Sequence, residues 1–125
     1  MKLFFAPALL LLLACGPTQK KEPVLAPREF QKQLSATPNA VLVDVRRPEE
    51  LVSGKIEGAR NIVFGSASFE KDILTLEKQP IFVYCAAGVR SAKAAALLRK
   101  NGYQVIELEG GFNEWVASGL PVTKR

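Results

Sequence analysis

The chain has 125 residues, of which 48% are hydrophobic and 23% charged, as expected for one folded domain with an apolar core. Its formal net charge of +5 comes from scattered basic residues, a pattern that indicates a solvated surface and predicts no nucleic-acid partner. Histidine is absent and the two cysteines, Cys15 and Cys85, form no CxxC pair. This composition excludes Cys-His and Ser-His-Asp catalysis, and we expect neither a metal site nor a cofactor.

The first fourteen residues have the pattern of an export signal. A basic start is followed by twelve apolar residues, 3–14, fewer than the roughly 20 that span a bilayer. We therefore expect a signal peptide over residues 1–14. The run ends in Leu12-Leu13-Ala14-Cys15, which resembles the lipobox of bacterial lipoproteins. The resemblance implies lipidation of Cys15, and hence an exported protein held on a membrane, on the periplasmic side in a bacterium with two membranes.

Residues 15–26 are rich in Pro, Lys and Gln and poor in apolar side chains, which predicts a flexible tether before a domain at residues 27–125. The alternatives are a plain secretory signal with a chance cysteine, or an uncleaved anchor. If Cys15 carries lipid, Cys85 is the one free thiol of the mature protein. A lone thiol in an oxidising compartment is either buried and inert or chemically active.

Beyond the tether, helical and strand patterns alternate. We expect helices at residues 27–35, 48–52, 69–76, 90–101 and 112–118, and strands at residues 41–45, 61–64, 81–84 and 105–108. Short apolar strands separated by helices are typical of parallel sheets. The expected fold class is therefore α/β, a single domain with a mainly parallel sheet of about four to five strands and helices on both faces.

Cys85 stands between the predicted strand at residues 81–84 and the helix at residues 90–101. Unpaired backbone N–H groups and the positive end of the helix dipole gather at such a turn, where they lower a thiol pKa and attract anions. Ligands of parallel sheets lie beyond the carboxyl ends of the strands, where both Asp44 and Cys85 fall. Cys85 is therefore the predicted nucleophile, and the alternative is a buried core cysteine without chemistry.

Three motifs follow one another along the chain: the Asp44-Val45-Arg46 stretch with residues 48–62, the Cys85 loop with its helix, and residues 110–115 (GGFNEW). Together, in this order, they resemble the signature of the rhodanese family. The resemblance covers residues 27–122, and Lys55 stands where the family often has histidine. It implies sulfurtransferase activity: the cysteine takes a sulfane sulfur from a small anionic donor such as thiosulfate and passes it to cyanide or a thiol.

The resemblance also implies roles for particular residues. Cys85 would be the nucleophile and Arg90 would complete an anion pocket, although Arg90 could also be a solvated residue at the helix start. The remaining loop residues would offer backbone N–H groups to the substrate: Ala86, Ala87, Gly88 and Val89.

The resemblance further implies that Asp44 and Arg46 brace the loop or bind the donor. The alternative is that these two residues form a purely structural ion pair. Ser91 is predicted to cap the helix and is a second candidate for substrate contact. Glu50 reads as a solvated surface residue.

Two other classes of function compete with sulfur transfer. A cysteine in an anion-binding loop also suits a phosphatase or an arsenate reductase, but phosphatase loops of the related fold place five residues between Cys and Arg. Here there are four, a smaller cradle that favours transfer of one sulfur atom. The other class is a non-catalytic module that docks a partner at the membrane.

Overall fold

The computed structural model describes residues 2–3 and 23–124. Cys15, most of the expected signal peptide and most of the expected tether lie outside the described residues. In the part that is described, no helix is both long enough and apolar enough to cross a bilayer.

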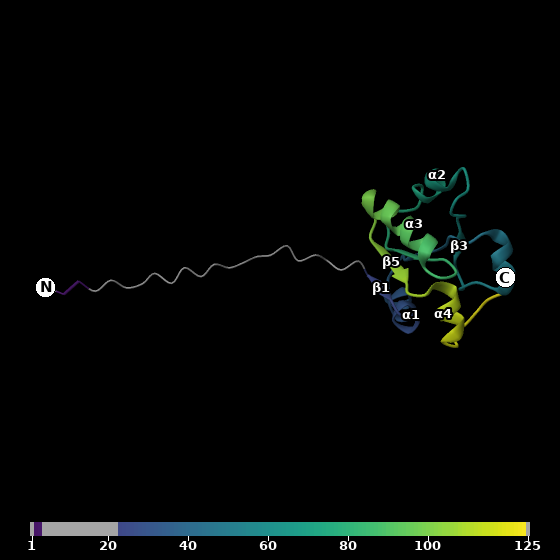
Figure 1. Cartoon of the computed structure of the whole chain (residues 1–125), viewed down its shortest axis with the longest axis horizontal. Coiled ribbons are helices and arrows are strands. Elements are labelled where there is room, and N and C mark those ends of the chain that lie inside the picture. The colour runs from purple at the N-terminus through teal and green to yellow at the C-terminus, as the bar shows by residue number, and fades with distance from the viewer. Residues whose placement is uncertain (1, 4–22, 125) are drawn as a thin grey trace.

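Helices and strands alternate along the chain (Figure 1). The strands are β1 (Val24–Leu25), β2 (Val41–Asp44), β3 (Arg60–Asn61), β4 (Ile81–Tyr84) and β5 (Val105–Leu108). The helices are α1 (Pro27–Ala36), the 3-10 helix η1 (Pro48–Ser53), α2 (Phe69–Ile73), α3 (Val89–Lys100) and α4 (Gly111–Ala117). Gly102 follows α3 with a φ of 84°, the left-handed conformation in which a helix commonly ends.

The strands form one five-stranded sheet in the order β1-β5-β4-β2-β3, with every pairing parallel. Helices α1 and α4 cover one face, and α2 and α3 cover the other (Figure 1). The α/β class, the parallel sheet and the covering of both faces are thereby confirmed. Asp44 lies opposite Tyr84 in the register, so the residues that follow β2 and β4 meet at one edge of the sheet.

Strand β1 was not expected, because Val24 and Leu25 were assigned to the tether. Both residues pair with β5, and the N–H groups of Glu107 and Glu109 donate to the carbonyls of Pro23 and Leu25 at 3.0 and 2.9 Å. The folded part therefore extends to the N-terminal side of residue 27. A two-residue strand shows no periodicity in sequence, and only the open edge of β5 gives it a position.

Two other elements are shorter than expected. Strand β3 stops at Asn61 and α2 stops at Ile73, where the patterns predicted residues 64 and 76. The N–H groups of Ile62 and Phe64 still donate to the carbonyls of Asp44 and Val45, so the chain stays beside β2 without forming a regular ladder. The apolar residues of this stretch are placed by packing on the core rather than by regular structure.

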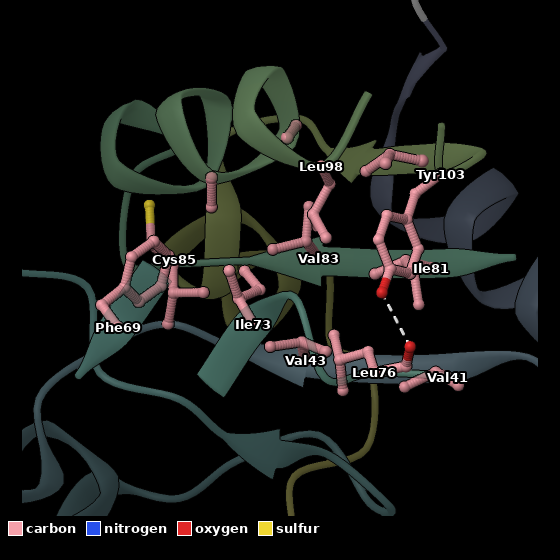
Figure 2. Close-up of a cluster of buried hydrophobic side chains, with 14 residues drawn as sticks. Val41, Val43, Phe69, Ile73, Leu76, Ile81, Val83, Cys85, Leu98 and Tyr103 are labelled. Carbon is pink, nitrogen blue, oxygen red and sulfur yellow. Dashed lines mark hydrogen bonds between the residues drawn. The ribbon is translucent and has the colours of Figure 1, made fainter. Parts of the chain in front are cut away.

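Strand β4 is buried on both faces, and Cys85 is the residue that follows it. One apolar cluster contains Val83, Cys85 and side chains of α2 and α3, and the other contains Phe82, Tyr84 and side chains of α1 and α4. Figure 2 shows Cys85 at one end of the first cluster, while a hydrogen bond from the Tyr103 hydroxyl to the Leu76 carbonyl, 2.7 Å long, lies at the other. A strand enclosed in this way gives the thiol a fixed attachment point.

Candidate active site

The loop after Cys85 is held from behind by the first turn of α4. The N–H groups of Phe112 and Asn113 donate to the carbonyls of Cys85 and Ala86, at 2.8 and 3.0 Å. Gly111 allows this approach, since its φ is 63° and a Cβ there would lie 2.5 Å from the Cys85 carbonyl oxygen. The C=O and N–H of a trans peptide point in opposite directions, so holding the Ala86 carbonyl against α4 turns the Ala87 N–H toward the sulfur.

Backbone and hydroxyl donors converge on Cys85 Sγ, which points from the sheet toward α3 (Figure 2). The Gly88 N–H donates to Sγ at 3.0 Å, and the Ser91 hydroxyl lies 3.4 Å away. Burial alone would raise the pKa of the Cys85 thiol, but the Ser91 hydroxyl and the N–H groups of Ser91, Ala87 and Gly88 outweigh it. The net pKa is below the ordinary value, which favours the nucleophilic thiolate.

Ser91 does not cap α3, contrary to the sequence prediction. The N-cap is Gly88, whose φ of 96° is the left-handed conformation that glycine adopts without strain, and no side chain caps this end. Ser91 lies in the first turn of the helix and is fully buried, with its hydroxyl directed at the sulfur. The Ser91 hydroxyl therefore contacts the sulfur of Cys85. A capping hydroxyl would instead have contacted the backbone N–H groups of the helix.

The other loop residues form the rim around the sulfur. Ala87 and Val89 are exposed, Ala86 and Gly88 are half-buried, and Cys85 itself is 1% exposed. The sulfur-bearing residue is therefore covered, while parts of the loop around it are open to solvent. The backbone N–H groups expected from this segment are present, and at least those of Ala87 and Gly88 are directed at the sulfur.

Asp44 and Arg46 form a buried ion pair at the end of β2. Arg46 Nη2 lies 2.7 Å from Asp44 Oδ2, and the two side chains are 2% and 0% exposed. The Arg46 guanidinium also stacks on Phe112, 4.2 Å from the ring centre, and donates to the carbonyls of Glu50 and Gly54 at 3.3 and 2.9 Å. Its donors are directed at the protein, so the pair fixes η1 in place beside α4.

Arg90 is paired with Glu50, so Glu50 is not the solvated surface residue that the sequence predicts. Arg90 Nη1 and Nη2 donate to Glu50 Oε1 and Oε2 at 2.6 and 2.9 Å, a bidentate contact between side chains that are 26% and 25% exposed. Hydrogen bonding to Arg90 lowers the pKa of Glu50 to about 2, and the same contact raises the pKa of Arg90. Arg90 is therefore beside the loop, as expected, but its charge is already matched.

Comparison with known proteins gives one consistent family. The model of the rhodanese-like domain matches residues 26–118. The uncharacterized protein YqhL of Bacillus subtilis is 44% identical over 77 residues, covering 61% of this chain and 60% of that protein. A sulfurtransferase of Allochromatium vinosum is 32% identical over 94 residues, covering 74% of this chain and 87% of that protein.

Solved structures agree with the sequence relatives. A rhodanese-related protein of Thermoplasma volcanium superposes with a TM-score of 0.74 at 29% identity, over 82% of this chain and 99% of that one. A protein of unknown function from Rhodopseudomonas palustris, described as a possible tyrosine phosphatase, gives 0.69 at 31% identity, over 81% and 84% of the two chains. The fold is shared by proteins given different activities, so function must be argued from the site.

Replacing Ser91 by alanine tests the donors around the sulfur. Ser91→Ala removes one hydrogen bond to the thiolate and leaves burial in place, so we expect the pKa of Cys85 to rise. The thiolate is followed by its ultraviolet absorbance against pH, as a difference from Cys85→Ser. Ser68→Ala, an exposed serine whose side chain caps nothing, is the control and should leave the curve unchanged. Superimposable curves for Ser91→Ala and the parent protein would contradict this account.

Proposed function

Since the chain belongs to the family of rhodanese-like domains, we propose that it is a sulfurtransferase that carries a sulfane sulfur on Cys85. The observation that carries the proposal is the environment of Sγ. The sulfur of Cys85, at the end of β4, accepts a hydrogen bond from the loop backbone and is hydrogen-bonded to the Ser91 hydroxyl, and these contacts leave the pKa of the thiol below its ordinary value. These donors stabilise a thiolate, and they would stabilise a persulfide anion in the same way.

The first half-reaction loads the sulfur. The Cys85 thiolate attacks the outer sulfur of a thiosulfate-like donor, a new S–S bond forms at Sγ, and the S–S bond of the donor breaks. Sulfite leaves with the electron pair of the broken bond, and the negative charge of the thiolate moves to the terminal persulfide sulfur. No proton is transferred, so the chemistry needs no general base, consistent with a chain that lacks histidine.

The second half-reaction unloads it. Cyanide or a thiolate attacks the terminal sulfur of the persulfide, and the S–S bond to Sγ breaks, which regenerates the Cys85 thiolate. With cyanide the product is thiocyanate. Cys85 is the free cysteine of the described residues, so the acceptor is taken to be a separate molecule and the kinetics to be ping-pong.

A phosphatase is the second candidate, because the Rhodopseudomonas palustris neighbour is described as a possible tyrosine phosphatase. Two features of this chain weigh against it. Four residues separate Cys85 from Arg90, which makes a small cradle, and both terminal nitrogens of Arg90 are already bonded to Glu50. The same site also argues against a non-catalytic docking module, because docking a partner would not require a stabilised thiolate.

We expect Cys85→Ser to abolish thiocyanate formation from thiosulfate and cyanide, with a loss of at least about 10³-fold, because the variant lacks the nucleophile. The matched control is Cys15→Ser, which removes the other cysteine and should keep the activity. The same preparations are assayed with p-nitrophenyl phosphate. Hydrolysis that depends on Cys85, without thiocyanate formation, would favour the phosphatase, and inactivity of the parent protein in both assays would favour the docking module.

We also propose that Cys15 is lipidated and holds the domain at the surface of a membrane, the membrane being a partner through lipid alone. The support is the apolar run at residues 3–14 and its ending at Cys15. When the full chain is expressed in a bacterium, the parent protein should partition into the detergent-rich phase of Triton X-114 and Cys15→Ala into the aqueous phase. Identical partitioning of the two proteins would refute the anchor.

A further inference from the structure

The arginines on and beside the Cys85 loop are each paired with a carboxylate. Arg46 contacts Asp44 at 2.7 Å, and Arg90 contacts Glu50 at 2.6 Å. Arg47, at the start of η1, lies 3.6 Å from Glu50. Cationic side chains therefore give this region little net positive charge, and the sulfur is stabilised by backbone and hydroxyl donors instead.

The Glu50 carboxylate is bound to the two terminal guanidinium nitrogens of Arg90, the same atoms that would bind an oxyanion. The two terminal nitrogens of a guanidinium bind the paired oxygens of a carboxylate or a sulfonate in the same bidentate geometry. In this structure both nitrogens donate to Glu50, at 2.6 and 2.9 Å. An anionic donor that approaches Arg90 must displace this carboxylate or share the guanidinium with it.

Arg90 links Glu50 to the Cys85 loop. The hydrogen bond from Arg90 to Glu50 is the main cause of the raised pKa of Arg90, and the charge of Cys85 adds a smaller contribution, so Arg90 interacts with both groups. The lowered pKa of Glu50, about 2, keeps this carboxylate ionised at neutral pH. A donor with two negative charges is repelled about twice as strongly by Glu50 as a donor with one.

We propose that Glu50 sets the donor preference of the site by competing for Arg90, which disfavours dianionic donors relative to monoanionic ones. The inference rests on the proposed sulfur transfer and adds a specificity residue to it. It follows that thiosulfate, with two charges, is a poorer fit to this site than a donor of the class of organic thiosulfonates, which carry one.

A matched pair of donors isolates the charge. Methanethiosulfonate has the structure of thiosulfate with a methyl group in place of one charged oxygen. In both reactions the Cys85 thiolate attacks the outer sulfur, one S–S bond forms and one breaks. Sulfite leaves from thiosulfate and methanesulfinate leaves from the thiosulfonate, each with the electron pair of the broken bond, so total charge is conserved in both.

The experiment compares the KM of the two donors in the full chain and in Glu50→Gln. Removing the carboxylate charge should lower the KM for thiosulfate by about tenfold and the KM for methanethiosulfonate by about threefold, with kcat changed less. The ratio of the KM for thiosulfate to the KM for methanethiosulfonate therefore falls by about threefold. Glu50→Asp, which keeps the charge, should keep the ratio close to that of the parent protein, and Glu50→Ala should lower it as Glu50→Gln does.

A second glutamate supplies the control. The Glu77 carboxylate accepts hydrogen bonds from both terminal nitrogens of Arg60 at 3.1 Å, in an exposed pair with the same bidentate geometry. Glu77→Gln should therefore leave the ratio of KM values unchanged. A ratio in Glu50→Gln and Glu50→Ala equal to that of the parent protein would overturn the role of Glu50 while leaving sulfur transfer intact. If the parent protein transferred sulfur from neither of the two donors, the proposed function would be overturned and this inference with it.

Discussion

Two hydrogen bonds from α4 to the backbone of the Cys85 loop determine the rest of the site. The N–H groups of Phe112 and Asn113 fix the carbonyls of Cys85 and Ala86, and the loop N–H groups are then free to face the sulfur. Gly111 is required for the approach. Segments that lie 27 residues apart in sequence, Cys85–Ala86 and Phe112–Asn113, thus set the direction of the loop donors, and the thiol acquires its lowered pKa from their geometry.

The site divides its electrostatic tasks between backbone and side chains. Dipoles of the loop and the Ser91 hydroxyl act on the sulfur, whereas Arg46 and Arg90 are committed to Asp44 and Glu50. In the proposed reaction the loop dipoles are already oriented toward the sulfur before the donor arrives, so they need little reorganisation as the persulfide forms. The ion pairs hold η1 and the loop together, and through Glu50 they act on which donors can enter.

Local patterns predicted the elements that hold Cys85. Strands β4 and β5 have the predicted bounds, and Cys85 follows β4 as expected, because apolar runs next to a helix-favouring segment leave few alternatives. What could not be predicted depends on contacts distant in sequence. Glu50 and Arg90 are 40 residues apart, and nothing in either segment indicates the other.

The remaining differences have the same origin. Strand β1 exists only because β5 offers it an edge, and Ser91 points to the sulfur only because Gly88, in the left-handed conformation, starts the helix earlier than predicted. The motifs of the sequence indicated which residues matter, and the tertiary contacts decided what each of them touches. For Glu50 the motif contained the residue, but its partner came from another part of the chain.

Intact-protein mass spectrometry can show whether Cys85 carries the transferred sulfur. The reduced, folded protein is treated with thiosulfate, separated from excess reagent and weighed, then treated with cyanide and weighed again. We expect the parent protein to gain the mass of one sulfur atom, which cyanide then removes, and Cys85→Ser to gain none. An unchanged mass in the parent protein, or a gain that persists in Cys85→Ser, would contradict this proposal.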